Sequence, residues 1–87
     1  MGMYYLAVDW KNRQIIEPPG CFANKSPGIF HPNNPFPNMV IMKNIQGYHF
    51  EIINDCGSEY ETACEFENIT KKVYDELLNF FPFYEEK

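Results

Sequence analysis

The distribution of proline constrains this chain more than any other feature. Six of its seven prolines lie in residues 18–38, together with two glycines and four asparagines. Because proline lacks an amide hydrogen and fixes φ, we expect neither a helix nor an inner strand there. We predict a long loop with His31 near its tip, either covering the core or serving a function. Apolar side chains would pin this loop to the domain: Phe22, Ile29, Phe30 and Phe36.

Three segments outside the proline-rich stretch have patterns typical of strands. Residues 4–17 alternate between two faces on either side of a polar break at 11–13, which predicts a hairpin. Residues 39–45 are an apolar run that suits an interior strand. After a turn at Gln46-Gly47, residues 48–54 are predicted to form the next strand.

Residues 59–67 support two interpretations. They alternate with period two over nine positions, with four glutamates on one face, which favours a strand. However, Ser58 and Glu61 match the capping box that starts many helices, so one helix of about 23 residues could begin at Ser58. We favour the strand, because the alternation is long and Tyr, Thr, Cys and Phe are weak helix formers.

The clearest helix is predicted over residues 69–81, where apolar side chains recur every four positions until Pro82. Residues 83–87 would follow as a short tail. With 87 residues, the chain has room for a single domain. The expected fold is therefore α+β, with a small antiparallel sheet of four or five strands and one C-terminal helix packed on a face.

Charge is distributed unevenly along the chain. The formal net charge is −5, yet residues 1–47 carry four basic and two acidic side chains, whereas residues 48–87 carry three basic and ten acidic ones. If residues 48–55 paired with residues 59–67, six carboxylates would share one face of the sheet. We expect this face to attract a basic partner or, more simply, to keep the protein soluble. The six are Glu51, Asp55, Glu59, Glu61, Glu65 and Glu67.

Several function classes receive no support from the sequence. Its few Lys and Arg residues argue against direct nucleic-acid binding, and its apolar runs are too short to cross a membrane. We find no catalytic motif, no cofactor motif and no metal-ligand spacing. Three cysteines, an odd number, together with an N-terminal segment unlike a secretory signal, favour a cytoplasmic protein with reduced thiols.

Three hypotheses of function remain. The leading one is a non-enzymatic protein-binding module whose acidic face engages a basic protein, as small inhibitors, immunity proteins and antagonists do. The second is an assembly subunit that associates with itself, for example as a homodimer, through the aromatic C-terminus and the proline-rich loop. The third is a small-molecule or metal site near His31 and His49. The possible interface residues are Phe30, His31, Phe36, Phe83 and Tyr84.

Overall fold

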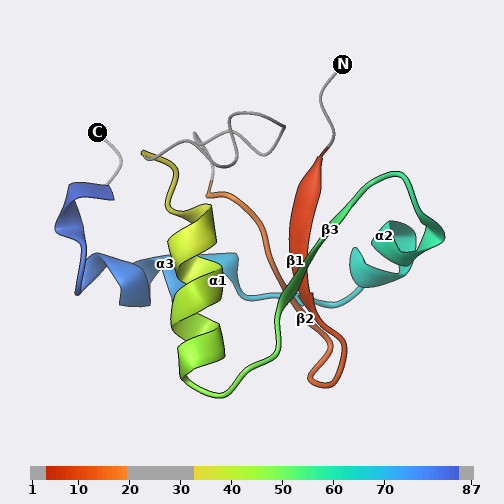
Figure 1. Ribbon diagram of the computed structural model, residues 1–87, viewed down its shortest axis with the longest axis horizontal. Helices are drawn as coiled ribbons and strands as arrows, with labels where there is room; N and C mark the ends of the chain where they lie inside the picture. The colour runs from red at the N-terminus through yellow and green to blue at the C-terminus, as the bar shows by residue number, and fades with distance from the viewer. Residues whose placement is uncertain (1–3, 20–32, 85–87) are drawn as a thin grey trace.

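The computed structural model describes residues 4–19 and 33–84 (Figure 1). The described residues form an α+β structure, as predicted, with a four-stranded sheet, three α-helices and a short 3₁₀ helix. In chain order the elements are β1 (Tyr5–Asp9), β2 (Gln14–Ile16), α1 (Phe36–Ile45), β3 (Glu51–Asn54), α2 (Ser58–Ala63), β4 (Glu67–Asn68), α3 (Thr70–Leu78) and η2 (Pro82–Tyr84).

The sheet is mixed, so the prediction of an antiparallel sheet is wrong in part. Its strand order is β3-β1-β2-β4, and β1 pairs antiparallel with both of its neighbours. The short edge strand β4 instead runs parallel to β2, with Ile15 opposite Asn68. A parallel strand needs a crossover connection rather than a tight turn. Here α1, β3 and α2 all lie between the two parallel strands in the sequence.

The predicted N-terminal hairpin is confirmed, and its turn is held by Asp9. One carboxylate oxygen accepts hydrogen bonds from the amides of Lys11 and Asn12, at 3.0 and 3.1 Å. The other accepts from the Asn12 side chain at 2.8 Å. Arg13 completes the reversal with a φ of 53°. Burial would raise the pKa of Asp9, but these hydrogen bonds and one from the His49 amide outweigh it and hold the pKa below its usual value.

Residues 39–45 form a helix, so the prediction of a strand there is wrong. Helix α1 begins at Phe36, inside the segment predicted to be a loop, and Pro37 lies in its first turn. Proline is tolerated at that position because the first amides of a helix have no partner within the helix. The predicted turn at Gly47 is confirmed and ends α1: Gly47 has a φ of 105°, and the Tyr48 amide bonds to the Lys43 carbonyl at 3.1 Å.

Residues 59–67 do not form a strand either. Helix α2 begins at Ser58, as the capping-box interpretation predicted, but no side chain caps it. The alternative of one long helix from Ser58 is also wrong, because the chain leaves helical geometry after Ala63 and passes through β4 before α3 begins. Burial explains why a helix forms at this position. In a helix, Tyr60 and Ala63, three positions apart, face the sheet together.

The helix predicted over residues 69–81 is confirmed as α3, which covers Thr70–Leu78 and so ends before Pro82. Packing on one sheet face is also confirmed, but α3 is not alone. Both α1 and α3 cover the face that carries Ala7 and Ile16. On the opposite face, α2 covers Leu6, Val8 and Ile15. Alternating strand residues thus contribute to two core clusters, one on each side of the sheet.

Candidate functional site

The six acidic residues singled out in the sequence do not share one face of a sheet. Glu51 lies on β3 and Glu67 on β4, which are the two outermost strands. Glu59 and Glu61 lie in the first turn of α2. Asp55 and Glu65 occupy the turns on either side of that helix. All six are exposed. They are spread over both edges of the sheet and the region of α2, and we refer to the set of six as the acidic surface.

Trp10, in the turn of the hairpin, contacts one of these carboxylates. Its indole Nε1 donates a 2.6 Å hydrogen bond to Glu51, and its ring packs edge-on against Phe66 at 5.5 Å. On the other edge of the sheet, Gln14 donates to Glu67 at 3.2 Å. These contacts orient two carboxylates without neutralising them.

The acidic surface has no basic counterpart in the described part of the chain. Salt bridges there join Lys43 to Glu76 and Lys71 to Asp75, and neither includes any of the six carboxylates. Tyr60 on α2 lies near one of the six, Asp55. Its pKa is raised, first by burial and then by the charges of Cys64, Asp55 and Glu17.

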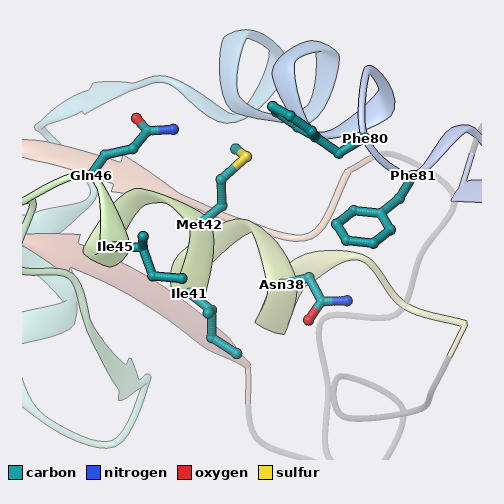
Figure 2. A pocket seen from close by; sticks show the side chains of 7 residues that line it. All are labelled: Asn38, Ile41, Met42, Ile45, Gln46, Phe80 and Phe81. Atoms are coloured by element: carbon teal, nitrogen blue, oxygen red, sulfur yellow. The ribbon is translucent and has the colours of Figure 1, made fainter.

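A second surface lies between α1 and the end of α3, where an apolar groove of about 390 Å³ opens to solvent (Figure 2). Ile41 and Ile45, one turn apart on α1, form one side, and Phe80 and Phe81 form the other. Met42 lies between them. Asn38 and Gln46, also on the α1 side, add the polar groups to the lining.

The aromatic wall of this groove is held in place. Tyr84 is buried, and its hydroxyl accepts a 2.7 Å hydrogen bond from the Asn38 side chain. The Tyr74 hydroxyl donates to the Tyr84 carbonyl at 2.5 Å. These bonds tie η2 to α1 and α3, so Phe81 and Phe83 belong to an anchored segment.

Lys43 connects α1 to α3 next to Gln46, one of the residues that line the groove. Its ammonium nitrogen lies 3.6 Å from Glu76, donates to Gln46 at 3.0 Å and lies 4.4 Å from the centre of the Tyr48 ring. The side chain is only 8% exposed. A buried ammonium group is stable when it is paired and hydrogen-bonded, as this one is.

The structure separates the residues proposed as a possible interface. Phe83 is 72% exposed, whereas Tyr84 is buried and serves as an anchor. Phe36, the first residue of α1, is fully buried in the core, so it is unavailable to a partner and this part of the prediction is corrected. Phe30 and His31 lie outside the described residues.

Sequence reasoning missed Ile41 and Ile45. The apolar run of residues 39–45 predicts an interior strand, in which both side chains would be buried. The one available signal was the position of Pro35 and Pro37 immediately before the apolar run, because proline is common in the first turn of a helix.

The arrangement of the described residues does not support the hypothesis of a small-molecule or metal site near His31 and His49. His49 is exposed, and His31 lies outside them. In the described ranges, no three His, Cys, Asp or Glu side chains converge as a metal site. Nor does any helix in these ranges have the length and apolar character needed to cross a bilayer.

Comparisons of the chain with models of known families, with curated proteins and with solved structures give no match.

Proposed function

We propose that this protein is a non-enzymatic protein-binding module whose acidic surface engages a basic surface of another protein. The observation that carries the proposal is the set of six exposed carboxylates without a salt bridge to any described Lys or Arg. Unpaired like charges on a folded surface repel one another, and a cationic partner relieves that repulsion.

The placement of the carboxylates supports a docking role. Glu59 and Glu61 project from α2, which packs on the sheet through Tyr60 and Ala63. They are therefore displayed on a fixed support, and little ordering would accompany binding. Small acidic inhibitors, immunity proteins and antagonists of nucleic-acid enzymes use surface charge in this way, and the likeness to them is one of size and charge alone.

The test is affinity capture from a lysate of the source cells, followed by elution with rising salt. The wild-type protein should retain a basic protein that salt releases, because screening weakens such contacts. Replacing Glu59, Glu61 and Glu65 together with lysine should abolish this capture without unfolding the protein, since all three side chains are exposed.

A charge change at another surface provides the control. Asp75 is exposed on the outer face of α3, outside the acidic surface, and Asp75→Lys should leave capture unchanged. Equal capture by the wild type and the triple-lysine variant would disprove the proposal. Circular dichroism of each variant would show whether a lost interaction reflects lost structure.

A second candidate function is that of an assembly subunit that associates with itself through the aromatic C-terminal end. The observation that favours it is the exposure of Phe80 and Phe83, at 67% and 72%, on a segment that Tyr84 anchors. Exposed apolar patches on a folded protein commonly mark interfaces. Self-association that persists at high salt, measured by light scattering, would support this candidate, and its absence at every concentration would exclude it.

A further inference from the structure

The outward side of α1 is apolar, which distinguishes it from the other helix of the groove. Ile41 and Ile45 are 54% and 81% exposed, although α1 already buries Phe36 and Met39 against the core. A helix with apolar side chains on both sides is normally covered on both. Helix α3 has the ordinary arrangement, with charged residues such as Lys71 and Asp75 on its exposed side.

We propose that a second copy of this chain covers the groove between α1 and α3, so that the protein forms a two-fold symmetric dimer. The inference rests on the assembly function proposed above and names the surface that carries it. The extent of the exposed apolar surface, its shape and its charge each favour this occupant.

The exposed area is sufficient for a weak but specific dimer. The apolar patch consists of the exposed parts of Ile41, Ile45, Phe80, Phe81 and Phe83. If a fully exposed side chain of this size presents on the order of 200 Å², their exposed fractions amount to roughly 600 Å² on each copy. Two copies would then bury roughly 1,200 Å², the lower end of the range for stable interfaces.

Two copies of this surface could fit together across a two-fold axis. Ile41 and Ile45 form a ridge directly beside the hollow that Phe80 and Phe81 border (Figure 2). In a two-fold interface the same patch serves both partners. The isoleucine ridge of each copy can therefore enter the groove of the other, as ridges enter grooves where helices pack.

Among the described residues, charge does not oppose this contact, although each copy carries −5. Lys43 is the only charged residue in α1, and Glu76 pairs with it. The acidic helix α2 lies at the opposite end of the long axis from η2 (Figure 1). The molecule extends 35 Å along this axis, whereas salt at physiological strength screens charges beyond about 8 Å.

Analytical ultracentrifugation over a range of protein concentrations, at low and high salt, tests the proposal. The wild type should approach twice the mass of one chain, equally well or better at high salt. Ile45→Glu should weaken the dimer about tenfold or more, because it places a charge in the buried apolar contact. Phe80→Ser should also weaken the dimer, because it removes an apolar side chain from the opposite wall of the groove.

Lys72→Gln is the matched control, because it changes the net charge by the same amount as Ile45→Glu on the exposed side of α3. It should leave the dimer unchanged, and equal weakening by both variants would overturn the proposal. A dimer that persists in both groove variants would also overturn it while leaving the assembly function intact. A wild type that stays monomeric at about 1 mM would overturn both.

Discussion

The ammonium nitrogen of Lys43 lies 3.6 Å from a carboxylate oxygen of Glu76, and this pair joins α1 to α3 next to Gln46, which lines the apolar groove. The two residues are far apart in the sequence. Gln46 strengthens the pair, since it accepts a hydrogen bond from Lys43 and donates one to Glu76. The relative position of the two groove walls therefore depends on a polar contact as well as on the core.

Lys43→Met should lower the free energy of unfolding by about 1–2 kcal/mol, measured by urea denaturation. Methionine retains the packing volume but loses the hydrogen bond to Gln46 and the ion pair. The loss is limited because Glu76 is 34% exposed and water can solvate it again. The control is Lys71→Met, which removes the exposed pair with Asp75 and should cost less than about 0.5 kcal/mol. Equal effects at the two sites would contradict this account.

Asp9→Ala should destabilise the protein by about 1–3 kcal/mol at pH 7, because the turn amides lose their acceptor. Since the folded pKa of Asp9 is lowered, its contribution is complete above the unfolded pKa of about 3.9 and is lost as pH falls through the folded value. The stability difference between wild type and variant should therefore shrink with acidification below about pH 4. A difference that grows there would refute this assignment.

Tyr84→Phe removes the hydroxyl that accepts from Asn38 and keeps the buried ring. We expect a loss of about 1 kcal/mol in thermal or chemical unfolding, typical of one hydrogen bond. Phe83→Ser, at the neighbouring exposed side chain, should change stability by less than about 0.5 kcal/mol. A reversed order of effects would show that η2 is not anchored through Tyr84.

Gly47→Ala should cost about 1–2 kcal/mol, because the φ of 105° that ends α1 disfavours a side chain. An added Cβ would meet no atom within 4 Å, so the cost comes from the backbone alone. Gly57→Ala is the matched comparison. Gly57 has a φ of −113°, and the nearest atom to an added Cβ is 4.0 Å away. Chemical denaturation of both variants should show a clear loss only at Gly47.

Local sequence patterns were sufficient to predict a helix or strand wherever the local pattern and the tertiary environment favour the same structure. The hairpin of residues 4–17 and the helix that became α3 follow from period-two and period-four spacing, and the structure confirms both. The unequal distribution of charge also follows from the sequence alone, as does the exposure of the glutamates, because a carboxylate is costly to bury.

Tertiary packing decided the ambiguous segments. Residues 39–45 are apolar enough for either a strand or a helix, and the core selected the helix because Met39, Val40 and Lys43 can then face inwards together. Residues 59–67 likewise do not form the strand that their alternation favours, because a helix allows Tyr60 and Ala63 to be buried together against the sheet.

The sequence by itself determined the α+β class, the hairpin, the last helix and the total charge, because each depends on neighbouring residues or on composition. Only the tertiary structure decided that the acidic residues spread over β3, α2 and β4, and that Ile41 and Ile45 lie beside Phe80 and Phe81. Such a groove joins segments that are distant in the chain. Its formation depends on how two helices pack on one sheet, which local periodicity does not encode.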